Sequence, residues 1–144
     1  MNIFYWSPFF DQIATIQAVI KSAESLIKYN NEKTSNKVFL IDSIGEWEPY
    51  KDLIDNQIEI IKLNKKNYTN SLLKGGFIRS RISYLFIFFL NFFKLTKLIN
   101  KEKPDFLIVH LMTSLPIFLS LFFNKKTKII LRISGLPNLN LLRL

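Results

Sequence analysis

His110 is the residue with the clearest capacity for chemistry, and it is the only histidine in the chain. It follows an apolar run, residues 106–109, that predicts a buried strand and places the imidazole where that strand ends. A histidine there can hydrogen-bond a substrate hydroxyl or transfer a proton near neutral pH. It can also be a structural residue whose nitrogens form hydrogen bonds within the protein, and position alone favours this second interpretation.

Other polar residues and a glycine also follow predicted strands. Thr113 and Ser114 precede a predicted helix that has Pro116 in its first turn, so capping is their expected role. The free N–H groups of such a helix would also attract an anion. Gly135 follows a strand predicted over residues 128–133, where a glycine allows a ligand to approach the backbone and equally suits an ordinary turn.

A glycine pair flanked by cations precedes the longest predicted helix. Gly75 and Gly76 lie between Lys74 on one side and Arg79 and Arg81 on the other. Free helix N–H groups together with cations would suit a phosphate, so this segment is either an anion contact or a plain loop. The chain has neither the Walker spacing nor a GxGxxG after the first strand, so nucleotide binding through those motifs is not supported.

The composition excludes several kinds of site. With one histidine and no cysteine, we expect no metal site, no disulfide and no thiolate chemistry, and a reducing cytosol is the natural compartment. No start resembling a signal peptide is visible. Hydrophobic residues make up 49% of the 144, which suits one domain with a buried core.

Apolar segments of strand length alternate with helical patterns along the chain. The expected strands are residues 3–7, 38–41, 58–63, 106–109 and 128–133. The expected helices are residues 16–28, capped by Thr15, 78–101 and 115–123, with one further helical turn at residues 51–54. This alternation predicts an α/β domain over residues 1–144, with a Rossmann-like, doubly wound parallel sheet of about five strands. Ligands of such sheets bind beyond the carboxyl ends of the strands, which selects residues 8–15, 42–45, 110–114 and 134–138.

The net charge of +9 and one very apolar helix raise the question of partners. A basic surface can bind phosphates of nucleotides, nucleic acids or lipid headgroups, although an AT-rich genome would also enrich lysine. The helix predicted over residues 78–101 is apolar on nearly every side between residues 84 and 93, so it either packs inside the protein or lies on a membrane. Residues 106–123 are nearly long enough to span a bilayer, but their polar residues and Pro116 favour a strand, a turn and a helix.

Three segments in order resemble the N-terminal domain of family 4 glycosyltransferases of the GT-B fold. Ile3 to Phe10 is similar to the family's first strand and its Ser-Pro-Phe-Phe exit. Lys103 to His110 is similar to the family's Pro-Asp, apolar strand and histidine pattern, and Ile129 to Gly135 is similar to the following strand and its glycine. In place of the family's Gly-Gly in the first loop the chain has Ile13 and Ala14.

The resemblance implies roles for particular residues. His110 would be the active-site histidine that faces the transferred sugar, and Gly135 the glycine after the fifth strand. Ser134 stands where the family usually has a histidine. The substrate-binding positions that the resemblance implies are Phe10, Asp11, Ala14, Thr15, Thr113, Ser134 and Gly135.

The resemblance also implies a reaction and its partners. It implies hexosyl transfer, with retention, from a nucleotide-diphosphate sugar to a glycan or a lipid-linked acceptor. A second Rossmann domain, which binds the donor in the family, is not found in residues 1–144, so we expect that this chain alone binds no cofactor and turns over no substrate. We expect it in the cytoplasm, peripheral at the inner face of the membrane. The alternative is a non-catalytic basic module for an anionic membrane surface or, less expected, nucleic acid.

Overall fold

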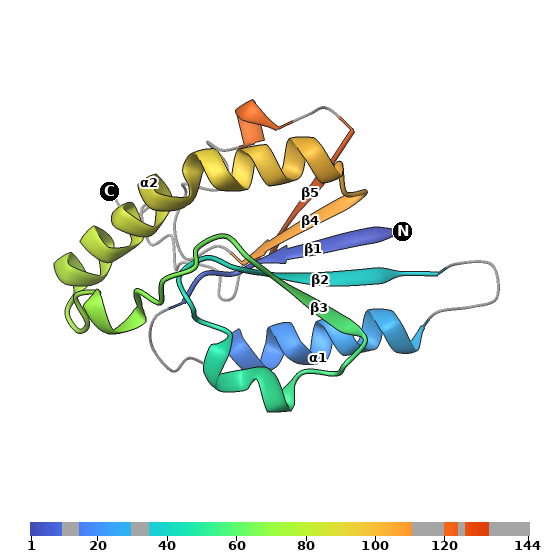
Figure 1. Ribbon diagram of the computed structural model, residues 1–144, viewed down its shortest axis with the longest axis horizontal. Coiled ribbons are helices and arrows are strands. Elements are labelled where there is room, and N and C mark those ends of the chain that lie inside the picture. Colours follow the sequence, from blue (N-terminus) through green and yellow to red (C-terminus); the bar gives the residue numbers. More distant parts are fainter. Residues whose placement is uncertain (10–14, 30–34, 111–119, 124–125, 133–144) are drawn as a thin grey trace, which may run out of the picture.

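The fold is a five-stranded parallel sheet with helices on both faces (Figure 1). A computed structural model describes residues 1–9, 15–29, 35–110, 120–123 and 126–132. The strand order is β3-β2-β1-β4-β5, and every neighbouring pair is parallel. The strands are β1 (Asn2–Trp6), β2 (Lys37–Asp42), β3 (Ile58–Lys62), β4 (Phe106–His110) and β5 (Lys128–Arg132). The predicted α/β, Rossmann-like sheet is therefore confirmed.

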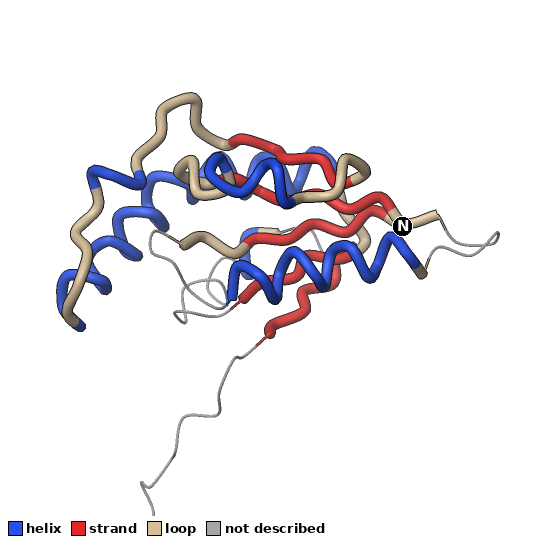
Figure 2. The backbone as a smooth tube through the Cα atoms, turned by 90° about the horizontal axis from the view of Figure 1, so that it is seen from below, coloured by secondary structure: helices blue, strands red, loops and turns tan. Residues whose placement is uncertain are grey.

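Two long helices cover opposite faces of this sheet, as Figures 1 and 2 show. They are α1 (Thr15–Lys28), between β1 and β2, and α2 (Phe77–Glu102), between β3 and β4. The described residues also form short 3-10 helices at η1 (Glu48–Leu53), η2 (Thr69–Ser71) and η3 (Ser120–Phe122). The apolar stripe predicted for α1 is the buried one, at Ile16, Val19, Ile20, Ala23 and Ile27.

The central strand β1 contributes to both hydrophobic cores. Its side chains alternate between faces, so Tyr5 packs in the core under α1 while Phe4 and Trp6 pack in the core under α2. The Tyr5 hydroxyl lies 2.8 Å from Ser22 Oγ of α1, and the Trp6 indole N–H donates to Ser43 Oγ at 2.8 Å. Both aromatic side chains are almost fully buried, so these bonds satisfy polar atoms that water cannot reach.

Helix α2 is buried along only part of its surface. Ile87, Leu95 and Ile99 are completely buried, whereas Phe89 and Phe93 are 71% and 80% exposed. The helix ends where Lys103 adopts a left-handed conformation, with φ of 46°, before a proline. The prediction of an interior helix therefore holds for one face of α2, and its other face is exposed.

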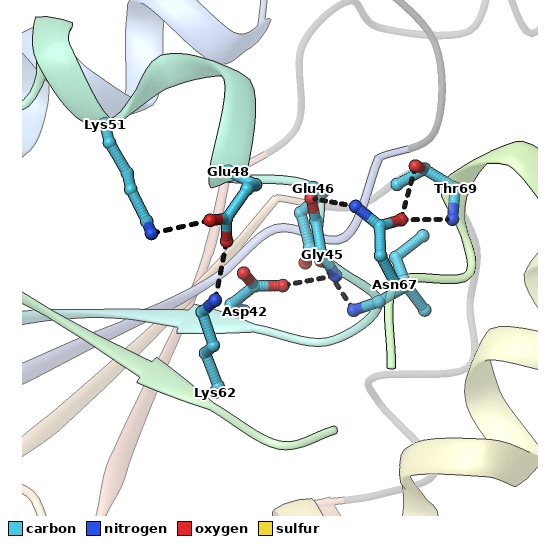
Figure 3. Close-up of polar contacts among 9 residues, drawn as sticks. Asp42, Gly45, Glu46, Glu48, Lys51, Lys62, Asn67 and Thr69 are labelled. Carbon is cyan, nitrogen blue, oxygen red and sulfur yellow. Dashed lines mark hydrogen bonds and ion pairs between the residues drawn. The ribbon is translucent and has the colours of Figure 1, made fainter. Parts of the chain in front are cut away.

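The turn after β2 is built on buried carboxyl groups (Figure 3). The backbone N–H of Gly45 donates to Asp42 Oδ1 at 2.6 Å, and the N–H groups of Ser43 and Ile44 donate to the Glu46 carboxyl at 2.9 and 2.7 Å. Gly45 has φ of 94°, and a Cβ added there would lie 2.5 Å from Asn67 Cγ. Both the backbone conformation and the close approach therefore require glycine.

Some predicted elements differ from the observed ones or lie outside the described residues. The helical turn expected near residues 51–54 is the 3-10 helix η1, which begins earlier, at Glu48. Most of the helix expected over residues 115–123 lies outside the described residues, and its last part, Ser120–Phe122, is a 3-10 helix. Residues 106–110 form β4, which is paired on both edges, and this argues against a membrane span over residues 106–123.

Replacing Gly45 by alanine is expected to destabilise the fold more than replacing Gly75, although both residues have positive φ. Gly75→Ala should lower the free energy of unfolding by about 1–2 kcal/mol, because alanine disfavours a positive φ. No clash adds to this loss, because a Cβ there meets no described atom within 4 Å. Gly45→Ala adds the clash with Asn67, for a total of about 2–4 kcal/mol. Urea denaturation of both variants measures the difference, and equal losses would contradict the steric part of this account.

Candidate functional site

The strand order reverses between β1 and β4, and this topological switch point is where open α/β sheets form a ligand crevice. The register pairs Trp6 of β1 with Val109 of β4. The next residue of each strand, Ser7 and His110, therefore stands at the carboxyl edge on either side of the switch point. Two polar residues thus follow two buried apolar strands at the position where the fold leaves room for a ligand.

The His110 imidazole is buried and neutral. The residue is 4% exposed, and Nε2 has no hydrogen-bond partner in the described part of the chain. Burial, with a smaller contribution from the charge of Arg132, lowers the pKa of His110 from 6.5 to about 4. At neutral pH the side chain is therefore an uncharged imidazole with one nitrogen unused, which suits hydrogen bonding to a substrate hydroxyl.

Ser7 and Arg132 complete a row with His110 across three adjacent strands. Ser7 is 4% exposed and its Oγ is also without a partner among the described residues. The register pairs His110 with Arg132 of β5, so all three residues share one face of the sheet, the face that α1 covers. The row brings a hydroxyl, a neutral imidazole and a guanidinium to the same edge, a set that can bind hydroxyl and phosphate groups together.

Tyr5 lies two residues before Ser7 on the same face and forms the inner wall of the row. Burial raises the pKa of its phenol, while the hydrogen bond with Ser22 and the charge of Arg132 act in the opposite direction. The phenol therefore stays protonated at neutral pH and ties β1 to α1. It has a structural part in the site, because its hydroxyl is already engaged.

The carboxyl end of β2, which was predicted as part of the crevice at residues 42–45, is occupied by structural contacts. Asn64 donates to the Ser43 carbonyl and to Asn91 Oδ1, each at 2.7 Å. Lys94 of α2 donates to Asn64 Oδ1. Burial, followed by hydrogen bonding with Asp42, raises the pKa of Glu46 well above its usual value. These groups bind one another and stabilise the turn. Asp42 Oδ2 nevertheless has no hydrogen-bond partner in the described residues, as Ser7 Oγ and His110 Nε2 have none.

The sequence-predicted site residues fall into three groups. His110 stands at the switch point as expected, and Thr15 is the first residue of α1. Lys74 and Arg79 line a shallow pocket with Gly75, Gly76 and Ile78 at the start of α2, and Arg81 is exposed on the next turn. The remaining ones lie outside the described residues: Phe10, Asp11, Ala14, Thr113, Ser134 and Gly135.

Ser7 and Arg132 were missed by the sequence reasoning. Each is a polar residue at the end of an apolar run. Ser7 was noted only as part of the Ser-Pro-Phe-Phe motif, and neither residue was given a role. The strand register reveals them, because it places both beside His110. In the described residues no group of three histidine, cysteine, aspartate or glutamate side chains is placed to hold a metal ion.

Comparison with known families gives one finding for this chain. A family model described as glycosyl transferase 4-like matches residues 35–141, which include β2 to β5 and therefore His110. A comparison with curated proteins gives no match.

The imidazole signals of His110 are expected to titrate near pH 4 in the folded protein, and they are easily assigned because the chain has one histidine. Arg132→Met should raise this pKa, because it removes a neighbouring positive charge. Lys128→Met removes a positive charge at the other end of β5, farther from His110, so it is the control and should have a smaller effect. Proton NMR between pH 3 and about 8 measures these values, and an unperturbed pKa would show that the ring is solvated.

The same shift makes the stability of the protein pH-dependent. The folded pKa of His110 lies below the unfolded value of 6.5, so the unfolded chain binds more protons between these two values. The contribution of His110 is fully present above pH 6.5 and is lost as the pH falls towards about 4. Urea denaturation of the wild type and of His110→Gln across this range should show that the loss is smaller in the variant.

Asp42→Asn is expected to increase stability at alkaline pH. The raised pKa of Glu46 contributes stability that is present below its usual value and is lost as the pH rises through the folded value. Asparagine keeps the acceptor for Gly45, removes a neighbouring carboxylate and offers Glu46 a donor, so the pKa of Glu46 should fall. Asp52→Asn, at an exposed carboxylate, is the control, and denaturation at neutral and alkaline pH measures the effect; equal curves would contradict the coupling.

Proposed function

The chain belongs to the glycosyl transferase 4-like family, and we propose that it is the acceptor-side domain of a glycosyltransferase. The reaction would transfer a hexosyl group from a nucleotide-diphosphate sugar to a hydroxyl of a glycan or lipid-linked acceptor, with retention of configuration. Family membership supports the transferase class. The switch-point geometry supports the assignment of particular residues.

The observation that carries this proposal is the unpartnered, neutral imidazole of His110 beside the unpartnered hydroxyl of Ser7 at the switch point. Buried polar atoms without a protein partner are few in folded proteins, and a ligand or an ordered water can supply the missing hydrogen bond. A sugar offers hydroxyl groups that can both donate and accept, so it can satisfy both side chains. A neutral imidazole also avoids placing a second positive charge beside Arg132.

In the proposed reaction the chain positions groups more than it forms bonds. The bond between the anomeric carbon and the donor diphosphate breaks, the acceptor oxygen bonds to that carbon, and the acceptor proton leaves with the diphosphate. His110 and Ser7 would hold hydroxyl groups of the reacting sugars, and Arg132 would stabilise negative charge that develops on the departing diphosphate. Donor nucleotide binding would come from a second Rossmann-like domain.

The remaining resemblance-derived positions keep their proposed roles beside this row. Thr15 begins α1 directly after the loop that leaves β1, so it lies near the same edge of the sheet. Phe10, Asp11, Ala14, Thr113, Ser134 and Gly135 would bind substrate, as the resemblance implies. The nucleotide-sugar donor is the only cofactor-like molecule that the proposal requires.

Acceptor binding tests the proposal directly on this chain. Short oligosaccharides are expected to shift the NMR signals of His110, and His110→Ala should weaken their binding about 5- to 10-fold through the lost hydrogen bond. Tyr29→Ala, at a 79% exposed side chain at the end of α1, is the matched control and should bind normally. A response to free nucleoside diphosphates without any response to oligosaccharides would contradict an acceptor-side role.

Turnover provides the second test. The chain by itself should transfer no sugar from nucleotide-diphosphate hexoses, because donor positioning is assigned to another domain. Combined with a donor-binding domain, the protein should gain transfer, and His110→Ala should lower kcat/KM by about 100-fold or more. Measurable transfer by the chain alone would show that donor binding resides within these residues.

A further inference from the structure

One face of α2 exposes a continuous row of large apolar side chains. Phe89 and Phe93 are 71% and 80% exposed, and Ile78 is 72% exposed, values unusual for side chains of this size in a water-facing helix. These residues recur at intervals of three and four, so they lie on one side of the helix. We call this the α2 stripe, and it consists of Ile78, Ile82, Leu85, Phe86, Phe89 and Phe93.

The stripe projects past the sheet because α2 is longer than the strands that it joins. A helix of 26 residues is about 39 Å long, whereas a five-residue strand spans about 17 Å. The end of α2 is held near the start of β4 by the short segment 103–105, so the excess length lies beyond the carboxyl edge of the sheet. Figures 1 and 2 show the first half of α2 extending there, on the side where the strands end.

The net positive charge of the protein is concentrated in the chain segment that contains this stripe. Residues 60–101 contain 9 of the 20 lysines and arginines and no aspartate or glutamate; the other 11 basic residues balance the 11 acidic ones. The net charge of +9 therefore resides in one segment. Arg79 and Lys97 are exposed beside one border of the stripe and Arg81 beside the other, while Lys74 and Arg79 line the pocket at its end.

We propose that the α2 stripe and its flanking cations dock the protein onto an anionic lipid bilayer. The partner must bury large apolar side chains and neutralise a dense positive charge at the same time, and the interface of an anionic bilayer offers both. A second copy of this face would bring two segments of +9 together. A nucleic acid would neutralise the charge but would leave the apolar row in water.

The helix lies on the bilayer and does not cross it. By length and composition, residues 78–102 would qualify as a membrane span. However, Leu95 and Ile99 are fully buried against the sheet, so the second half of the helix is already committed to the core of the domain. The stripe from Ile78 to Phe93 extends about 22 Å and faces outward, which is the arrangement of an interfacial helix.

Docking through this stripe also bears on which acceptor the protein would use, a point that rests on the proposed transferase function. The projecting half of α2 and the row of Ser7 and His110 lie at the same, carboxyl side of the sheet. The row stands on the face that α1 covers and α2 covers the opposite face, so the bilayer and the crevice would share the carboxyl edge of the sheet. This arrangement favours a lipid-linked acceptor, presented from the inner leaflet, over a free glycan.

Vesicle binding tests the docking surface without reference to sugar transfer. The chain should co-sediment with vesicles of phosphatidylglycerol and phosphatidylcholine, bind weakly to phosphatidylcholine alone, and lose affinity as salt is added. Phe89→Ser with Phe93→Ser should weaken binding at least about 10-fold. Tyr29→Ser, an equally exposed aromatic residue on another helix end, is the control and should leave binding unchanged.

A charge pair isolates the electrostatic part. Lys74→Gln with Arg79→Gln should weaken binding to the phosphatidylglycerol vesicles about 30-fold, because each cation near the surface contributes to the attraction. Lys21→Gln with Lys28→Gln removes the same charge from the exposed side of α1 and should have a much smaller effect. All four sites are exposed, and unchanged urea denaturation curves confirm that each variant is folded.

Three results would overturn the proposal. The first is the absence of vesicle binding, and the second is binding that ignores both lipid charge and salt. The third is that the wild type sediments as a dimer without vesicles and the Phe89→Ser, Phe93→Ser variant sediments as a monomer, since the stripe would then be an interface between copies. Because none of these measurements involves sugar transfer, failure of the docking surface and failure of the transferase assignment can be distinguished.

Discussion

Burial of β1 on both faces is the constraint on which the rest of the structure depends. Three consecutive aromatic residues, Phe4, Tyr5 and Trp6, are each at most 3% exposed, and their alternation divides them between the two cores. Two of them carry a polar atom that needs a partner when buried. Ser22 on α1 and Ser43 after β2 supply these partners, so the central strand fixes the helix on one face and the turn of its neighbouring strand.

The candidate site follows from where this buried strand and its neighbour end. Up to Trp6 and Val109 both strands are filled with apolar side chains, and the next residues are Ser7 and His110. They remain shielded from solvent by the same packing, yet the apolar core offers them no hydrogen-bond partner in the described residues. The low pKa of His110 has the same origin, because burial penalises the charged imidazole and Arg132 adds repulsion.

A mismatch of lengths gives α2 two different environments. The half that runs back along the sheet contributes Leu95 and Ile99 to the core, and the half beyond the carboxyl edge has no sheet to cover. Large apolar side chains of that first half are exposed, which indicates that another partner buries them. Anionic lipid is the partner that we propose, because it matches both their hydrophobicity and the basic residues around them.

Much of the fold could be predicted from the sequence alone. Apolar runs of strand length, alternating with a helical stripe, determined all five strands and both long helices, because period and length distinguish the two elements. The same pattern placed His110 at a carboxyl edge, and three short motifs indicated the family that the comparison then matched. Composition alone excluded disulfides and thiolate sites, since the chain has no cysteine.

Only the tertiary structure decided which residues accompany His110. Ser7 and Arg132 are separated from it by 103 and 22 positions, and strand pairing, a long-range interaction, brings them into one row. At residues 42–45, a loop predicted to face the crevice, Glu46 and Asn64 bind the backbone and Lys94 in turn donates to Asn64, while Asp42 Oδ2 has no partner in the described residues. Local sequence determines how each segment folds, whereas partners of buried polar atoms depend on contacts that form only when the layers pack.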